Sequence, residues 1–127
     1  MKTIKMISMS LLIALFLMMG TAMQAQDPMK AGPKVYKKVL LNNDKVRVMK
    51  VEFAPGQIMP WHNHPHHTIY ALTDGTLEIT EKGKPAAIAK FKAGDVLYFT
   101  PVTHTGKNIG KNTVKLVVTE IKHSMKK

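Results

Sequence analysis

From Val35 to Ile121 the sequence is a succession of short runs rich in β-branched and aromatic residues, each closed by a turn signal. No stretch of this region repeats its apolar residues with the 3.6-residue period of an amphipathic helix. About eight such runs, at intervals of roughly 8–12 residues, are typical of an all-β sandwich or barrel. We therefore predict an all-β fold, and a chain of 127 residues has room for one such domain.

The predicted strands cover residues 35–41, 46–53, 61–73, 76–80, 86–91, 96–100, 104–109 and 114–121. Turn residues separate them, as in Asn42-Asn43-Asp44 and Gly110-Lys111-Asn112. Asp74-Gly75 is a strong hairpin signal, so we expect the strands on its two sides to pair with each other.

Residues 1–25 have the organisation of a secretory signal peptide. Lys2 and Lys5 form a positive start, an apolar run of about 14 residues follows, and small residues lie near its end. The run is shorter than the roughly 20 residues that span a bilayer, so we expect cleavage and no stable membrane insertion afterwards. Cleavage can follow Ala22 or Ala25, and the alternative is an uncleaved N-terminal anchor. The mature protein is therefore expected to be periplasmic or secreted.

After the signal peptide we expect a flexible lead-in (26–33), one folded domain (34–123) and a basic tail (124–127). The absence of cysteine excludes a disulfide scaffold, a thiolate zinc site and a cysteine nucleophile. The formal net charge falls from +11 to +9 on cleavage, because the signal peptide holds two lysines and no acidic residue. The cations are dispersed lysines with a single arginine, so we expect no nucleic-acid partner. A basic surface can instead attract anionic small molecules.

Five of the six histidines fall in two places: His62, His64, His66 and His67 lie in one short segment, and His104 lies far from it in the sequence. Alternate residues of a strand share a face, so the first two can direct imidazoles to one side. A third imidazole from a distant strand would complete a set of three nitrogens with positions left open for water or substrate. We therefore expect a divalent transition metal: iron, zinc, nickel, copper or manganese. The alternative is an exposed loop that picks up metal adventitiously.

The spacing of these histidines resembles the first motif of the cupin family, which reads Gly, five residues, His-x-His, three or four residues, Glu, six residues, Gly. Gly56, the His62 and His64 pair, and Gly75 all fit this spacing. The departure is Thr68, which stands where the family has its glutamate. A threonine hydroxyl is a poor metal ligand at neutral pH, so the family's carboxylate ligand is missing.

The second cupin motif ends in His, three residues, Asn, and His104 and Asn108 match it. The interval from Pro101 to the histidine is two residues shorter than in the family, and the glycine before the histidine is absent. The resemblance implies a double-stranded β-helix, also called a jelly-roll or cupin barrel. It also implies that His62, His64 and His104 occupy the histidine ligand positions.

Without the carboxylate, the site is either a three-histidine centre with open positions or free of metal. His66 and His67 are the candidates to fill the gap. Three neutral imidazoles leave the full +2 on a divalent ion, which favours a small, anionic partner. Thr68 and Tyr98 are candidate substrate contacts, and no catalytic residue is assigned.

The resemblance implies a metal-dependent enzyme with dioxygenase-, lyase- or isomerase-like chemistry. Two alternatives stay open. One is a non-catalytic cupin that binds or senses a small ligand, and the other is an envelope metal buffer that uses His66 and His67. Small cupins similar to this chain usually pair through exposed strands, so we expect a homodimer.

Overall fold

The computed structural model describes residues 26–122. The predicted signal peptide (1–25) and basic tail (124–127) lie outside the described residues, so their predictions stand as made. Within residues 26–122 there is no helix with the length and apolar character that crossing a membrane requires.

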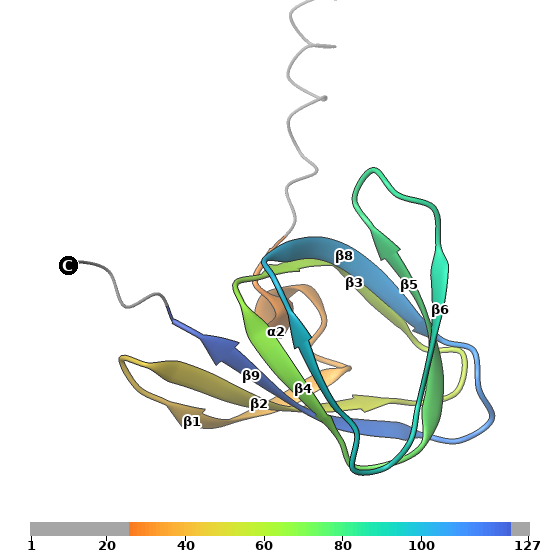
Figure 1. Cartoon of the computed structure of the whole chain (residues 1–127), viewed down its shortest axis with the longest axis horizontal. Coiled ribbons are helices and arrows are strands. Elements are labelled where there is room, and N and C mark those ends of the chain that lie inside the picture. The colour runs from red at the N-terminus through yellow and green to blue at the C-terminus, as the bar shows by residue number, and fades with distance from the viewer. Residues whose placement is uncertain (1–25, 123–127) are drawn as a thin grey trace, which may run out of the picture.

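The described chain folds into strands and one short helix (Figure 1). In chain order the elements are α2 (Pro28–Ala31), β1 (Tyr36–Asn42), β2 (Val46–Phe53), β3 (Ile58–His64), β4 (His67–Ala71), β5 (Gly75–Glu81), β6 (Ala87–Phe91), β7 (Val96–Phe99), β8 (Val102–Asn108) and β9 (Val114–Ile121). The all-β prediction is confirmed, and β2 and β9 match their predicted bounds. The stretch 61–73, predicted as a single run, forms two strands, because the chain passes from one sheet to the other at Pro65-His66.

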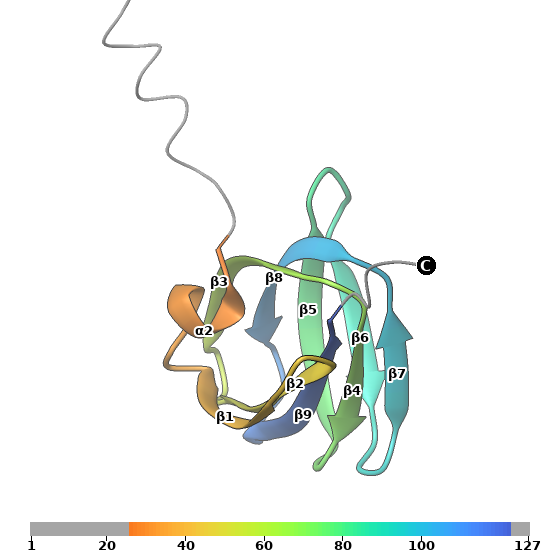
Figure 2. The same ribbon diagram turned by 90° about the vertical axis from the view of Figure 1, so that its left-hand side faces the viewer.

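The strands form two antiparallel sheets with orders β1-β2-β9-β4-β7 and β3-β8-β5-β6. The sheets curve around a shared interior, as the two perpendicular views show (Figures 1 and 2). Strands that follow each other in the chain often lie in different sheets, which is the arrangement of a jelly roll. The predicted jelly-roll barrel is therefore present.

The hairpin predicted at Asp74-Gly75 is wrong. β4 pairs with β7 and β9, whereas β5 pairs with β6 and β8, so the two strands flanking this turn belong to different sheets. Gly75 does not have the positive φ of a tight hairpin turn. Its role is close packing: a Cβ at this position would come within 2.5 Å of Val114 and 2.8 Å of Phe91.

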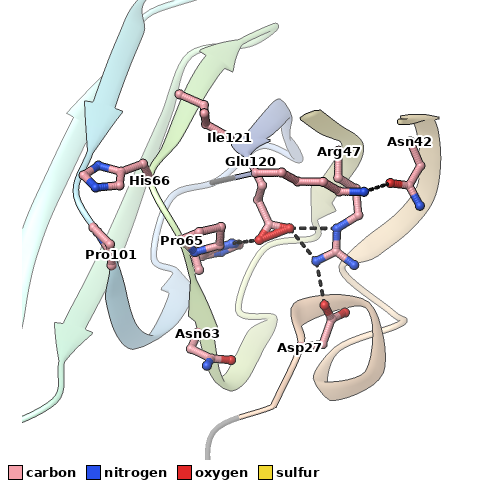
Figure 3. Close-up of a pocket in the computed structure, with 11 residues that line it drawn as sticks. Asp27, Asn42, Arg47, Asn63, Pro65, His66, Pro101, Glu120 and Ile121 are labelled. Carbon is pink, nitrogen blue, oxygen red and sulfur yellow. Dashed lines mark hydrogen bonds and ion pairs between the residues drawn. The ribbon is translucent and has the colours of Figure 1, made fainter. Parts of the chain in front are cut away.

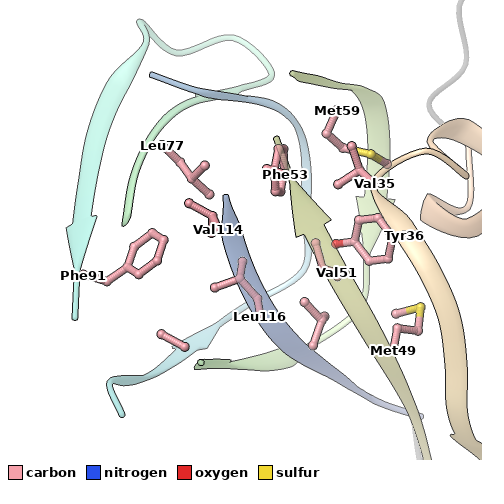
Figure 4. Packing of buried hydrophobic residues seen from close by; sticks show 12 residues of the cluster. Val35, Tyr36, Met49, Val51, Phe53, Met59, Leu77, Phe91, Val114 and Leu116 are labelled. Atoms are coloured by element: carbon pink, nitrogen blue, oxygen red, sulfur yellow. The ribbon is translucent and has the colours of Figure 1, made fainter. Parts of the chain in front are cut away.

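Apolar side chains from both sheets fill the interior (Figure 4). The buried core consists of Val35, Tyr36, Met49, Val51, Phe53, Met59, Ala71, Leu77, Phe91, Val114, Leu116 and Val118. In β9 every second residue is buried, as expected for a strand with one face in the core. Removing these side chains from water is the main favourable contribution to folding.

The segment expected to be a flexible lead-in contains α2 and packs against β1 and β3 (Figure 2). Asp27 caps this helix by accepting a hydrogen bond from the N–H of Met29 at 3.0 Å, and Pro28 is favoured at the first helical position. The carbonyl of Gln26 accepts a hydrogen bond from the N–H of Asn63. These contacts place Asp27 next to the histidine-bearing strand.

Candidate metal centre

A bulge in β3 decides which of its residues face the interior. Met59 lies opposite Gly106 and His62 lies opposite His104, so two residues of β3 (Pro60-Trp61) stand against one residue of β8. The extra residue shifts the alternation by one position, and Met59 and His62 are therefore both buried. Proline has no N–H to donate to the sheet, which suits it to a bulge.

His62, His64 and His104 form a compact cluster. One nitrogen of each lies within 4.8 Å of the others. The ring centroids are 4.5 Å apart for His62 and His104, 4.8 Å for His62 and His64, and 5.4 Å for His64 and His104. Nitrogen–metal bonds are about 2.0–2.1 Å long, so this cluster could hold one metal ion. The structure thus brings together the three histidines proposed from the sequence.

The donor atoms of the cluster suit a transition-metal ion. Nδ1 of His62 donates to the carbonyl of Pro60 at 2.7 Å, and its Nε2 is buried without a hydrogen-bond partner. Burial lowers the pKa of His62 to about 4 and that of His104 to about 2, so both are neutral at neutral pH. A buried acceptor left unpaired costs about 1–3 kcal/mol, and a metal bond would remove that cost.

His64 contacts a chain of charged groups made of Glu120, Arg47 and Asp27, and Figure 3 shows these three lying next to one another. Its Nδ1 donates to Glu120 Oε2 at 3.3 Å, and Arg47 Nε donates to Glu120 Oε1 at 2.8 Å. Arg47 also forms an ion pair with Asp27 at 2.6 Å. Burial raises the pKa of Glu120, but the hydrogen bonds from His64 and Arg47 outweigh it and hold the pKa below its usual value. Glu120, Arg47 and Asp27 line an open pocket of about 730 Å³, and His64 lies in the wall of the same pocket.

Glu120 and Tyr36 are candidate functional residues that the sequence did not reveal. In β9 the residues Val114, Leu116 and Val118 are buried, and Glu120 continues the same phase. An acidic residue in an inward position of a strand was the signal that could have identified it. Nothing in the local sequence distinguishes Tyr36, whose hydroxyl reaches the cluster only because β1 lies beside it.

In β4 the inward position belongs to His67 and not to Thr68. Thr68 lies opposite Tyr98 on the neighbouring strand, so the two share the face opposite to His67. Tyr98 is exposed, and its hydroxyl lies 2.5 Å from Nδ1 of His66. The structure therefore does not bring Thr68 or Tyr98 into the histidine cluster, and their contact with a substrate stays a prediction.

His67 resembles His62 in its surroundings. It is buried, its Nδ1 donates to the carbonyl of Pro65 at 2.9 Å, and its Nε2 has no hydrogen-bond partner. Its ring centroid lies 4.4 Å from that of His64 and 6.5 Å from that of His104. His67 comes from the sheet opposite to the other histidines, so it lines the cluster from the far side.

Two cavities adjoin the cluster. A small one of about 40 Å³ is lined by Tyr36, His62 and His104 among apolar side chains. A larger one of about 290 Å³ lies between the two sheets and also touches His104. Its walls are mostly apolar. The charged residues in these walls include Glu81 and Lys84, which form an ion pair at 2.6 Å.

Fold and site together define a double-stranded β-helix protein with a three-histidine cluster that could hold a metal ion. Residues 49–120 match the cupin domain family Cupin_2. The chain belongs to the cupin family. No curated protein matches this sequence.

Solved cupin structures are similar to this chain. A cupin domain from Bordetella pertussis Tohama I is 22% identical with a TM-score of 0.65, over 80% of this chain and 100% of that one. An RmlC-like cupin from Methanocaldococcus jannaschii is 19% identical with a TM-score of 0.58, over 68% and 78%. A cupin-like protein from Thermotoga maritima is 28% identical with a TM-score of 0.54, over 67% and 66%. These similarities support the fold and do not identify a substrate for this chain.

Proposed function

We propose that this protein is an exported, metal-dependent cupin enzyme that acts on a small anionic molecule. His62, His64 and His104 would hold one divalent transition-metal ion. The observation that carries the proposal is the convergence of one nitrogen from each ring within 4.8 Å inside a barrel. When bound, such an ion polarises an oxygen of the substrate as a Lewis acid and orients it.

The preference for an anion follows from the charge of the site. All three proposed ligands are histidines, which bind a metal as neutral imidazoles, so a divalent ion would keep its full +2 charge. The nearest carboxylate that contacts a ligand, Glu120, is already paired with Arg47 and His64. A substrate carboxylate, enolate or oxyanion would supply the missing negative charge.

The larger cavity supports a proposal about the rest of the substrate. Its volume of about 290 Å³ admits a small molecule, and His104 lies in its wall. Ile69, Leu77 and Leu116 contribute apolar surface to both this cavity and the smaller one. A substrate with an apolar body and one anionic end would match these surroundings.

Elemental analysis of the native protein, isolated from its exported location without an affinity tag, tests the proposal. We expect about one transition-metal ion per chain in the wild-type protein and a large loss in His104→Ala. His66→Ala is the matched control, because His66 lies outside the cluster and should leave the metal content unchanged. Less than roughly a tenth of an equivalent in reconstituted wild-type protein would refute the metal centre.

A cupin that binds or senses a ligand without turning it over is the second candidate. The mostly apolar walls of the larger cavity favour it, because they suit the binding of an apolar ligand body. Mass spectrometry of ligands retained through purification, combined with a turnover assay under air, separates the two. A retained ligand that stays unchanged would favour binding, and consumption of the ligand would favour an enzyme.

Export and dimerisation complete the proposal. β7 ends one sheet, and all four of its residues are exposed, which makes this edge suitable for pairing with a second copy. N-terminal sequencing of the exported protein would identify the cleavage position, Ala22 or Ala25. Light scattering would give the number of chains per particle.

A further inference from the structure

Tyr36 contacts the metal centre although it belongs to neither histidine motif. It is the first residue of β1, its side chain is buried, and its hydroxyl lies 2.9 Å from Nε2 of His64. Its ring centroid lies 5.8 Å from those of His62 and His64. The phenol therefore stands at the cluster itself, on the side from which a metal ion would meet His64.

The direction of this hydrogen bond follows from the groups around it. Glu120 is a carboxylate and can only accept, so Nδ1 of His64 carries the proton. In a neutral imidazole Nε2 is then an acceptor, and the hydroxyl of Tyr36 is its donor. A phenol carries its proton at neutral pH, so the hydroxyl of Tyr36 is available as a donor.

A metal ion and the Tyr36 hydroxyl compete for the same lone pair on His64. A nitrogen–metal bond of about 2.1 Å leaves no room for the hydroxyl at its present 2.9 Å along that lone pair. Binding of an ion therefore breaks the Tyr36–His64 hydrogen bond. The hydroxyl becomes a buried donor without an acceptor, which is unfavourable until a new acceptor arrives.

The smaller cavity is where that acceptor can lie. Tyr36, His62 and His104 line its volume of about 40 Å³, and the remaining wall is apolar apart from the backbone. One water molecule needs about 10–15 Å³ of such space, so the cavity has room for a small group of atoms. An anionic group placed there would contact the ion on one side and the phenol on the other.

We propose that the hydroxyl of Tyr36 donates a hydrogen bond to the anionic group of the ligand that binds at the open position of the metal ion. This inference rests on the proposed three-histidine centre. It assigns Tyr36 two opposed effects: the hydroxyl hinders metal binding by occupying Nε2 of His64, and it then helps the loaded protein to bind an anion. A purely structural tyrosine would affect both steps in the same direction or neither.

Cobalt titration followed by azide titration of the full chain tests the proposal, with the absorption spectrum of the bound cobalt as the readout. In Tyr36→Phe, which keeps the ring, we expect Co²⁺ to bind several-fold more tightly, because no hydroxyl has to be displaced. We expect azide to bind about tenfold more weakly, because its hydrogen-bond donor is lost. Tyr70→Phe is the matched control, because Tyr70 is exposed and lines neither cavity beside the histidine cluster, and it should change neither constant.

Each outcome of the two titrations either supports or overturns the inference about Tyr36. Opposite shifts of the two constants in Tyr36→Phe alone support the inference. Unchanged constants, or a weakening of both, overturn it and leave the metal centre standing. A wild-type protein that binds Co²⁺ but no azide also overturns it. A wild-type protein that takes up no Co²⁺ refutes the proposed function and this inference with it. Urea unfolding of both variants shows that the comparison is made between folded proteins.

Discussion

Nδ1 of His64 lies 3.3 Å from Oε2 of Glu120, and the two residues come from strands of opposite sheets. The side chains of both are almost fully buried, and Arg47 neutralises the carboxylate from its outer side. A carboxylate that accepts the second ring proton fixes the tautomer and the orientation of a ligand histidine. We therefore infer that Glu120 would position His64 in the proposed metal centre.

Replacing Glu120 with glutamine is expected to weaken both stability and metal binding. The variant keeps the shape but leaves Arg47 without its buried partner, so the free energy of unfolding should fall by roughly 2–4 kcal/mol. Metal affinity should fall about 10- to 100-fold, because the acceptor of the His64 proton loses its negative charge. Urea unfolding and competition with a chelator measure the two effects. Glu52→Gln is the control, because its pair with Lys50 lies at the surface; equal losses in both variants would contradict the positioning role.

The stability of the metal-free protein should fall as the pH is lowered from 7 to 4. The pKa of His62 is about 4 in the folded chain against an ordinary 6.5, so between these values the unfolded chain binds more protons. His62 alone should remove on the order of 3 kcal/mol by pH 4, and His104 acts in the same direction. Glu120 and Asp27 have lowered pKa values, so their contributions are present above about pH 4 and are lost only below it. Urea unfolding at each pH in the presence of a chelator checks this, and a flat profile between pH 7 and 5 would refute it.

The two histidines left open by the sequence should behave differently. His67 faces the cluster with an unpartnered Nε2, whereas Nδ1 of His66 is bonded to Tyr98 at the surface. We predict that His67→Gln weakens metal binding by about tenfold or more and that His66→Gln has no effect. Isothermal titration with Zn²⁺ measures both. More than one ion per chain, reduced by either substitution, would instead favour the metal-buffer alternative.

Gly75 should tolerate no side chain. A Cβ there would lie 2.5 Å from Val114 and 2.8 Å from Phe91, both in the core, so we predict that Gly75→Ala costs about 1–3 kcal/mol. Gly110→Ala is the matched control, because its nearest new contact is 3.4 Å from Asn108. Thermal unfolding of the two variants tests this. Equal midpoints would mean that the Gly75 position relaxes without cost.

The strands were predictable because their signals are local. The bounds of β2 and β9 follow from β-branched residues between clear turns, and the Gly56 to Gly75 spacing indicated the family. The prediction of a hairpin at Asp74-Gly75 was wrong because a turn signal does not determine which sheet the next strand joins. That choice depends on contacts between strands distant in the chain.

The sequence by itself determined the all-β character, the positions of most strands along the chain and the types of residue that a metal centre would need. Only the tertiary structure decided which of these residues meet. The bulge at Pro60-Trp61 reverses the alternation that a regular strand would have, and this turns His62 toward His104. Glu120 and Tyr36 join the centre through strand pairing, which no local pattern encodes. The sequence gives the type of each residue directly. The neighbours of a residue across a sheet depend on the register of the strands, and register depends on contacts throughout the fold.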